Sequence, residues 1–577
     1  GTSADMSIRT YFDRTVEGHP QRIAIQYRQQ DQIISRTYAE MARRVRAVAE
    51  LAHELGLAPR TAPVAVILEN SPEWMEIYLA HAGCGITVVP IDPKLRPSEV
   101  AYILKDSGAA AVYTDRRHIP LLQEILPELP ALRQIVLLDG TADKAETCAD
   151  RPCHAFVPRV EALGGQAEKP DGFYRQQVAR PADIASIIYT SGTTGVPKGA
   201  MLTHANFCAD AEGALQLITH ITGEDRFMIV LPLFHSFSFT ANFVAPLCIG
   251  ARMQFVTNLR SVGEDLKRYS PTVLMGVPLL VEKVYAKIIK NIRRSPLAQF
   301  LIFIGLRSLV ARGVRRNLGG ALRLIVVGGA PCSKKVLIGM RKFGLPIIEG
   351  YGLTEAAPIV SITKIDNVRP GTIGVPLPNI EVRIADADAN GVGELQVRGP
   401  IVTQGYLNQP EATAEAFDGD WLRTGDLASQ DPDGHLSIRG RKKALIVNRE
   451  GKNIYPEEVE VCIGRDPRIL DVVVIGYREK GEVGEKVGAI VVPNLENFKA
   501  VDADNPDWPE IEKRTRAIIR KQCQKLADYK HPRKVEIRRD PLERTSIQKI
   551  RRHIYQGQLD SLAPAPADGA DDADDSL

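Results

Sequence analysis

Short, continuously apolar runs alternate with segments of helical periodicity in the first part of the chain. Residues 184–192 (IASIIYTSG) and 322–331 (LRLIVVGGAP) are short and rich in β-branched side chains, whereas residues 72–85 (PEWMEIYLAHAGCG) repeat apolar positions at i, i+3 and i+4. Buried strands separated by helices are typical of parallel sheets that are covered on both faces. The pattern therefore predicts an α/β fold with largely parallel sheets.

The pattern changes after Gly371, where the stretches NIEVRIAD, GELQVRG and HLSIRGR alternate apolar and polar residues. Such alternation predicts antiparallel strands with one solvated face. After Arg441 the chain returns to strand, helix and strand on a smaller scale. We expect a large N-terminal domain of stacked α/β sheets with a β-rich subdomain over residues 1–440, and a small α+β C-terminal domain over residues 441–556.

Two segments are expected to lie outside these cores. Residues 142–182 are rich in glycine, proline and charge, and they are expected to form a surface excursion. Residues 557–577 are acidic and, apart from leucines, lack large apolar side chains, so we expect a disordered tail.

The composition of the 577 residues, with 44% hydrophobic and 25% charged side chains, is that of a soluble globular protein. A net charge of +3 without an arginine-rich arm argues against a nucleic-acid partner. The eight cysteines are scattered and form no CxxC pair, which favours free thiols in a reducing cytosol. No apolar signal segment is visible at the start, and the apolar run 300–306 is too short to span a bilayer, so a cytoplasmic protein is expected.

The stretch YTSGTTGVPKG at residues 189–199 is the strongest candidate for chemistry. Its three glycines allow tight turns that aim backbone N–H groups at one concavity, while its hydroxyl side chains and Lys198 add polar donors and a positive charge. Such a loop suits a polyphosphate. It is not a Walker A loop, because Gly199 follows the lysine and no serine or threonine comes next. A surface linker is the alternative, but a linker has no reason to follow a buried strand directly.

Further motifs follow in a fixed order, and together with the loop they carry a resemblance to a known family. They are LPLFHSF (231–237), VGGAP (327–331), GYGLTE (350–355), WLRTGD (421–426), GRKKALIV (440–447) and ERTSIQKIRR (543–552). The chain resembles the adenylate-forming enzymes, which include acyl-CoA synthetases, firefly luciferases and peptide-synthetase adenylation domains. The resemblance implies ATP and Mg²⁺ as cofactors, and coenzyme A as a co-substrate.

The resemblance also implies roles for individual residues. It implies nucleotide contacts by Thr190, Ser191, Gly192, Thr193, Thr194, Gly195, Lys198, Gly329, Ala330, Pro331, Tyr351, Gly352, Thr354, Asp426 and Arg441. Catalytic roles fall to Thr194, His235, Glu355 and Lys549. Glu355 is the implied metal ligand, and a carboxylate is the hard oxygen ligand that Mg²⁺ prefers.

In the family, the small C-terminal domain is mobile and rotates between two half-reactions. The resemblance places the hinge at Lys443 and the thiol-acceptor loop around Gly451. Two positions depart from the family pattern: Ile547 and Gln548 stand where Ser/Thr and Gly usually precede the catalytic lysine, and Glu450 replaces a loop glycine. Both departures concern the small domain and bear on the acceptor of the acyl group.

The substrate is inferred from apolar segments. Residues 234–249 are mostly small and apolar, and the segment from 281 to 316 resembles a basic insertion of long-chain fatty acyl-CoA synthetases. That insertion either contacts an anionic membrane surface or forms an ordinary hairpin that covers the sheet. We predict a medium- or long-chain fatty acid:CoA ligase that forms AMP. The alternatives are an acyl-AMP ligase that delivers to a carrier protein, an adenylating β-lactone-type synthetase and, on the same fold, a non-catalytic lipid-binding homologue.

Overall fold

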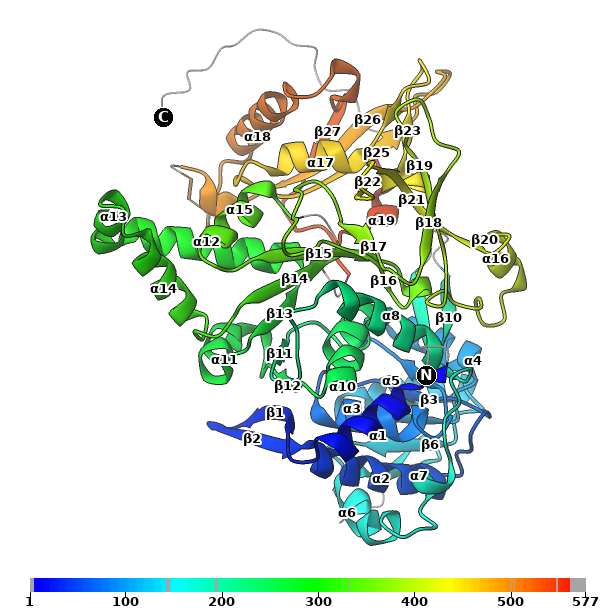
Figure 1. Cartoon of the computed structure of the whole chain (residues 1–577). Coiled ribbons are helices and arrows are strands. Elements are labelled where there is room, and N and C mark those ends of the chain that lie inside the picture. Colours follow the sequence, from blue (N-terminus) through cyan, green and yellow to red (C-terminus); the bar gives the residue numbers. More distant parts are fainter. Residues whose placement is uncertain are drawn as a thin grey trace. The chain divides into compact units, whose positions relative to one another are not determined.

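The computed structural model describes residues 5–141, 146–191, 196–329, 332–499, 501–502, 504–545 and 548–560, with the backbone alone at residues 146, 147 and 191. The chain forms two compact units (Figure 1). The large unit contains Gly1–Arg383, Gln396–Arg423 and Asp431–Leu436, and the small unit contains Ile384–Leu395, Thr424–Gln430 and Ser437–Leu577. The domain boundary expected at 440/441 stays a prediction.

The main sheet of the large unit has nine strands in the order β17-β16-β15-β14-β13-β11-β12-β1-β2. The strands are β17 (Val375–Pro376), β16 (Ile359–Ile362), β15 (Ile347–Gly352), β14 (Leu324–Gly328), β13 (Val273–Gly276), β11 (Arg226–Ile229), β12 (Arg252–Phe255), β1 (Ile23–Gln29) and β2 (Gln32–Thr37). From β1 to β15 all neighbours are parallel, whereas β2, β16 and β17 are antiparallel to their neighbours at the two edges. Every residue of β13 and β14 is buried, which explains their uninterrupted apolar sequences.

A second sheet of eight strands has the order β10-β9-β4-β3-β5-β6-β8-β7. Its strands are β10 (Pro197–Thr203), β9 (Ile184–Ser191), β4 (Val88–Pro90), β3 (Val64–Val66), β5 (Ala111–Thr114), β6 (Gln134–Leu137), β8 (Arg151–Ala155) and β7 (Glu146–Cys148). The surface excursion expected at residues 142–182 is wrong in part. β8 continues this sheet beside β6, and Phe156 and Val160 of helix α6 (Phe156–Ala167) pack into the core, because these apolar side chains are spaced one helical turn apart.

Aromatic packing fixes the segment that follows β11. Helix α9 (Ser236–Phe239), the π-helical turn η4 (Thr240–Val244) and helix α10 (Ala245–Ile249) run on without a break. The ring of Phe239 lies 4.6 Å from that of Tyr78 in α3 (Pro72–Ala82) and 4.8 Å from that of Phe207 in α8 (His204–Leu217). These contacts hold the short helices against α3 and α8 within the main core.

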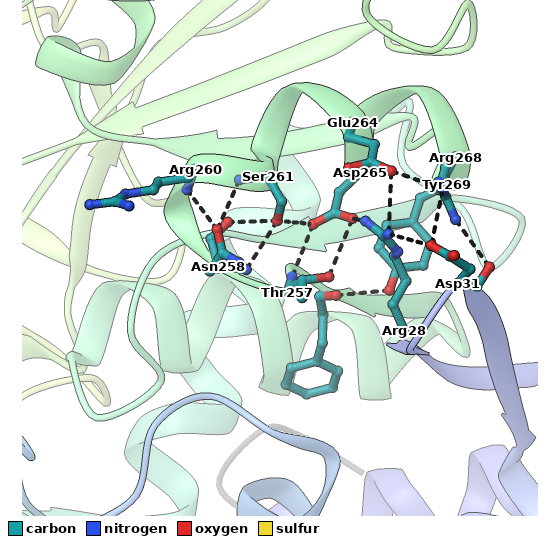
Figure 2. A network of polar contacts seen from close by, with 11 residues as sticks. Arg28, Asp31, Thr257, Asn258, Arg260, Ser261, Glu264, Asp265, Arg268 and Tyr269 are labelled. Carbon is teal, nitrogen blue, oxygen red and sulfur yellow. Dashed lines mark hydrogen bonds and ion pairs between the residues drawn. The ribbon is translucent and has the colours of Figure 1, made fainter.

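A polar network fastens the edge hairpin β1–β2 to helix α11 (Val262–Tyr269), as Figure 2 shows. Arg28 of β1 forms an ion pair of 2.6 Å with the fully buried carboxylate of Asp265. The same carboxylate accepts hydrogen bonds from the backbone N–H of Thr257 and the hydroxyl of Ser261, both at 2.9 Å. Because a cation and several hydrogen-bond donors surround the carboxylate of Asp265, the network has a structural role and holds the hairpin against α11.

The small unit is α+β. Its three-stranded sheet comprises β25 (Ile469–Tyr477), β26 (Lys486–Pro493) and β27 (Lys534–Ile537), and helices α17 (Pro456–Gly464) and α18 (Trp508–Cys523) contribute to its core. A two-stranded ribbon joins β23 (Ile446–Val447) to β24 (Asn453–Ile454).

A five-stranded sheet comprises β18 (Glu381–Ala385), β19 (Gly393–Arg398), β21 (Trp421–Gln430), β20 (Phe417–Asp418) and β22 (Leu436–Arg441). The predicted fold class, a large α/β part with a β-rich region and a smaller α+β part, is confirmed. No helix among the described residues is long and apolar enough to cross a membrane.

Candidate active site

The predicted polyphosphate loop connects two antiparallel strands. β9 ends at Ser191 and β10 begins at Pro197, with Lys198 paired to Thr190. β9 carries buried Ile187 and Ile188, so the loop does follow a buried strand. The residues at the centre of the predicted phosphate contacts, Gly192, Thr193, Thr194 and Gly195, lie outside the described residues, as does the side chain of Ser191.

Lys198 and Glu355 come from different motifs, and the structure brings them to the same tyrosine. The Lys198 ammonium lies 5.0 Å from the centre of the Tyr406 ring, and the Tyr406 hydroxyl donates a hydrogen bond of 2.8 Å to Glu355 Oε1. Burial is the largest cause that raises the pKa of Tyr406, and the negative charge of Glu355 is the second. The phenol therefore keeps its proton and donates the hydrogen bond to Glu355. We call these three residues the Lys198–Tyr406–Glu355 cluster.

Tyr406 is held in place by backbone contacts between its segment and β10. The N–H of Met201 donates to Gly405 O at 3.0 Å, and the N–H of Leu407 donates to Gly199 O at 2.8 Å. Sequence analysis missed Tyr406, because one tyrosine in QGYLN carries no pattern that separates a site residue from a packing residue.

Glu355 is suited to be a protein ligand of a magnesium ion that binds together with a polyphosphate. It lies on the 3₁₀ turn η6 (Thr354–Ala356), which begins two residues after the last residue of β15. Across the described parts of the chain, no three His, Cys, Asp or Glu side chains gather as a metal cage. Mg²⁺ commonly keeps several waters and takes one or two carboxylates plus substrate phosphates, so a single half-buried carboxylate suits it.

Glycines at the ends of β14 and β15 leave room for the close approach of other groups. Gly328 pairs with Gly350, and a Cβ on Gly328 would lie 3.1 Å from the Phe237 ring. A Cβ on Gly352 would lie 1.8 Å from Pro358 O, so no other residue fits there. Since the parallel strands β11, β13, β14 and β15 all end at this edge, the edge is the expected place for a ligand in an α/β sheet.

A buried carboxyl that sequence analysis also missed lies near the predicted adenine-contact residues that follow β14. Gly329 has φ of +90°, and Ala330 and Pro331 lie outside the described residues. Glu349 Oε1 accepts a hydrogen bond of 2.7 Å from the N–H of Cys332, just beyond the turn. Burial raises the pKa of Glu349 to about 7. A carboxyl group of β15 therefore binds the backbone one residue beyond the predicted adenine-contact residues.

His235 and Thr354 lie on segments that meet. His235 is the N-cap of α9, and its Nδ1 accepts from the N–H of Phe237 at 3.4 Å, which leaves the proton of a neutral ring on Nε2. The hydroxyl oxygen of Ser236 lies 3.2 Å from that of Thr354, within hydrogen-bond distance. Tyr351, also predicted to contact the nucleotide, pairs with Ser361 of β16.

An apolar cavity of about 30 Å³ lies beside this edge of the sheet. Phe237 and Gly350 line it, together with Ala241 of η4 and Ala211 of α8. The remaining lining residues come from α8 and its C-terminal end, from η4, α10 and the strands of the main sheet, and they are apolar except for Thr240. The cavity has the size of one water molecule, yet its lining offers almost no polar partner, so it suits hydrocarbon.

In the small unit, the structure brings together Asp426, Arg441 and Lys549. Arg441 Nη1 forms an ion pair of 2.8 Å with Asp426 Oδ1, and Asp426 is 5% exposed. Burial lowers the pKa of Lys549, whereas the Asp426 charge raises it and the Arg441 charge lowers it. The residue Lys549 is nevertheless exposed to solvent. Protein atoms therefore surround part of the side chain and lower the pKa of its ammonium group, while solvent still reaches it.

A tight turn presents Lys549. The N–H of Thr545 donates to Lys549 O at 2.7 Å, and the N–H of Gln548 donates to Thr545 O at 2.9 Å. Gln548 has φ of +66°, a conformation that favours glycine, so the backbone keeps the shape expected of a glycine at this position. Ile547 lies outside the described residues.

The predicted hinge and acceptor loop lie on two different turns of the small unit. Lys443 is exposed on the 3₁₀ turn η7 (Lys442–Ala444), after β22. Gly451 has φ of +77° in the turn between β23 and β24, where its N–H donates to Asn448 O at 3.0 Å. The positive φ explains the glycine at this position.

Parallel strands that end together at glycine-rich segments, beside a lysine, a carboxylate and an apolar cavity, are typical of an α/β enzyme of the nucleotide-binding class. More specifically, this chain belongs to the AMP-binding enzyme family. The model of the AMP-binding enzyme matches residues 12–407, and the model of the AMP-binding enzyme C-terminal domain matches residues 458–549. The predicted resemblance is confirmed.

Individual relatives agree with the family. The chain is 31% identical to the long-chain-fatty-acid–CoA ligase FadD15 of Mycobacterium bovis, over 80% of this chain and 78% of that protein. It is 31% identical to the long-chain-fatty-acid–CoA ligase of Escherichia coli O157:H7, over 91% of each chain. The crystal structure of ATP-bound MatB from Rhodopseudomonas palustris covers 96% of this chain and 99% of its own, with a TM-score of 0.76 and 25% identity.

Proposed function

We propose that this protein is an AMP-forming fatty acid:CoA ligase, an acid–thiol ligase that uses ATP, Mg²⁺ and coenzyme A. The observation that carries the proposal is the Lys198–Tyr406–Glu355 cluster, which joins residues of two predicted motifs, with a small apolar cavity at Gly350 five residues before Glu355. Relatives named long-chain-fatty-acid–CoA ligases, matched over 78% and 91% of their own lengths, support a fatty acid as the substrate.

In the first half-reaction, a carboxylate oxygen of the fatty acid attacks the α-phosphorus of ATP. The new bond to phosphorus forms as the bond to the bridging oxygen breaks, and pyrophosphate leaves with its electron pair. Lys198 places a cation beside the phosphates, and Tyr406 orients the carboxylate of Glu355. Mg²⁺, held through Glu355, supplies charge neutralisation on the phosphate oxygens when bound.

The roles of the remaining residues are part of the proposal. We assign His235 to the acyl end of the adenylate and Thr354 to its phosphate. The remaining predicted nucleotide contacts in the large unit are made by Thr190, Gly329, Tyr351 and Gly352. In the small unit, Asp426 accepts hydrogen bonds from the ribose hydroxyls, and Arg441 supports Asp426 through their ion pair. Lys549 stabilises the charge that develops on the α-phosphate.

In the second half-reaction, the thiolate of coenzyme A attacks the acyl carbon and expels AMP. A carrier-protein thiol in place of coenzyme A is the alternative that the departures at Gln548 and Glu450 leave open. We propose that the small unit moves about Lys443 between the steps and brings the loop at Gly451 to the acceptor. We also propose a cytoplasmic location, with peripheral contact to membranes where fatty acids partition.

The acceptor is tested by supplying purified protein with MgATP, a long-chain fatty acid and coenzyme A, and by quantifying the products by mass spectrometry. We expect acyl-CoA and AMP in equal amounts. Free acyl-AMP that accumulates while coenzyme A is not consumed would contradict the ligase and favour a carrier-protein acceptor. A β-lactone product from a 3-hydroxy acid would favour the cyclising alternative.

A further inference from the structure

The turn that presents Glu355 has an unusual backbone. The turn η6 ends at Ala357, which is fully buried and has φ of +71°. A residue with a Cβ adopts this left-handed conformation only where its surroundings hold it, and such positions cluster at functional sites. The contacts of this turn therefore show what fixes the place of the Glu355 carboxylate.

Thr240 of η4 makes the first contact with the turn. Its hydroxyl donates a hydrogen bond of 2.7 Å to Ala357 O, and its side chain is fully buried. Among the described residues that line the apolar cavity, Thr240 is the only polar one. Because a hydroxyl in an apolar wall needs a partner, the hydrogen bond to the turn explains why a threonine stands there.

Asp210 of α8 makes the second contact. Its Oδ2 accepts a hydrogen bond of 3.0 Å from the N–H of Ile359, two residues after Ala357. In the part of the chain that the structure describes, its Oδ1 has no hydrogen-bond partner. Burial raises the pKa of Asp210 well above its usual value, so the group stays a neutral acid that accepts a hydrogen bond from this backbone.

Both contacts come from the wall of the apolar cavity. Thr240 lines the cavity directly, and Asp210 precedes Ala211, which lines it from α8. Ile359 lines the cavity as well, so the segment that follows the turn is part of the wall. The wall of the cavity and the turn that carries Glu355 are therefore joined in one packed unit.

We propose that Thr240 and Asp210 are positioning residues for the magnesium ligand Glu355. They act through the backbone of the turn, whereas Tyr406 orients the carboxylate through its side chain. Mg²⁺ demands near-ideal octahedral geometry, so a carboxylate that shifts with its turn binds the ion less tightly. This role rests on the proposed function of Glu355, and nucleotide binding tests it without an acid substrate. A protein that binds MgATP but activates no fatty acid would refute the ligase and leave the positioning role intact.

The test is isothermal titration calorimetry of ATP binding, with Mg²⁺ present and with EDTA in its place. The ratio of the two dissociation constants gives the gain in affinity that the metal supplies. T240V keeps the size of the side chain and removes the hydroxyl, so the gain should fall about tenfold, the lower end of the range for lost outer-shell partners. T240S restores the donor and should restore the gain. Neither change should alter the binding of metal-free ATP.

Asp210 gives an independent answer if T240V fails to fold. D210A removes the acceptor, so the gain should fall about tenfold, whereas D210N keeps a neutral acceptor and should retain the gain. Equal losses in D210A and D210N would contradict the role of a neutral acceptor.

A matched control separates positioning from a general loss of stability. Thr114 is fully buried in β5 of the second sheet, and its hydroxyl donates to Ile67 O at 2.9 Å. T114V should lower the midpoint of thermal unfolding as T240V does, yet keep the gain of the wild type. An equal loss of the gain in T114V, or a full gain in both T240V and D210A, would overturn the proposal.

E355Q distinguishes the positioning role from the assignment of the ligand. Loss of the gain in E355Q alone, with T240V and D210A unaffected, would refute positioning and keep Glu355 as the ligand. A full gain in E355Q would show that Glu355 does not bind the metal, and the positioning role would fall with that assignment.

Discussion

At the residue scale, the Lys198–Tyr406–Glu355 cluster shows how one phenol can serve two charged groups. The ring face lies toward the Lys198 ammonium, and the hydroxyl holds one oxygen of the Glu355 carboxylate. Because a charge-assisted hydrogen bond orients its acceptor, Tyr406 fixes the carboxylate that we propose as the magnesium ligand.

Replacing Tyr406 by phenylalanine tests that role. Y406F keeps the ring beside Lys198 and removes the hydrogen bond to Glu355, so metal affinity should fall 10- to 100-fold, the range typical of lost outer-shell partners. The measurement is the Mg²⁺ dependence of fatty acid-dependent ATP–pyrophosphate exchange. Y174F removes a comparable hydroxyl contact, 3.2 Å from Asp13 Oδ1, and should leave the dependence unchanged. An unchanged Mg²⁺ dependence in Y406F would contradict the assignment.

Glu349 predicts a pH dependence of stability. Its pKa is raised from 4.5 to about 7 by burial, so the folded state binds the proton more tightly than the unfolded state. Stability from this group is therefore complete at low pH and falls as pH rises from about 4.5 through 7, by about 2–3 kcal/mol. E349Q retains an acceptor for the Cys332 N–H and stays neutral, so this decline should disappear.

The free energy of unfolding at pH 5.5 and pH 8 measures the effect. E128Q changes an exposed carboxylate and should keep the slope of the wild type. A slope in E349Q equal to that of the wild type would show that Glu349 is not the group that titrates.

At the element scale, the segment α9–η4–α10 carries both His235 as its N-cap and the wall of the apolar cavity. A π-helical turn in the middle of this segment places Thr240 and Ala241 at the cavity. Such turns are frequent at functional sites. We infer that this segment determines how far an acyl chain can enter.

Filling the cavity should change the preference for chain length. A241M adds volume to a lining position, so kcat/KM for a long-chain acid should fall at least tenfold relative to a short-chain acid. A205M places the same side chain on the half-buried first turn of α8, outside the cavity lining, and should not alter the ratio. Equal loss for short and long acids in A241M would show that the cavity does not receive the chain.

Helices and strands were predicted well from the sequence where the spacing of apolar residues distinguishes the two. Buried strands such as β13 and β14 are short, apolar and flanked by helices, and these features suffice for an α/β fold. Residues 142–182 were misjudged, because glycine, proline and charge in the segment concealed β8 and α6. The side on which the apolar residues of α13 (Pro296–Phe303) lie could not be predicted, since a short apolar helix fits a core and a surface equally well.

The candidate site was predicted unevenly for physical reasons. Motif residues such as Glu355 and Arg441 were identified by resemblance, but the ion pair between Arg441 and Asp426 is a contact that only the structure shows. Tyr406 was missed because it meets Glu355 across 51 residues of sequence, and only the folded chain creates that contact. Gln548 stands where the family usually has glycine, yet its backbone adopts the positive φ that glycine favours. The residue type alone does not predict this conformation.

At the scale of the whole molecule, the residues proposed for catalysis are divided between two compact units. The Lys198–Tyr406–Glu355 cluster and the cavity belong to the large unit, and Asp426, Arg441 and Lys549 belong to the small unit. The proposed adenylation therefore draws on residues from both units, whereas the proposed acceptor loop at Gly451 belongs to the small unit alone.

Removing the ammonium of Lys549 should separate the half-reactions. K549A should slow formation of acyl-AMP 10²- to 10³-fold, as expected for the loss of one group that stabilises transition-state charge. The rate of thioester formation from supplied acyl-AMP should stay within a few-fold of the wild type. Single-turnover measurements of each step distinguish the outcomes, and K525A, in the same unit, is a matched lysine control. Equal loss in both steps would contradict the division of labour.

The most direct test of the proposed function is MgATP–pyrophosphate exchange across a series of carboxylic acids from short to long aliphatic chains, with aryl acids in parallel. The account predicts exchange that depends on added acid and rises with aliphatic length to a maximum among medium or long chains. Exchange that no carboxylic acid stimulates, or that responds to aryl acids and is flat across aliphatic lengths, would contradict it.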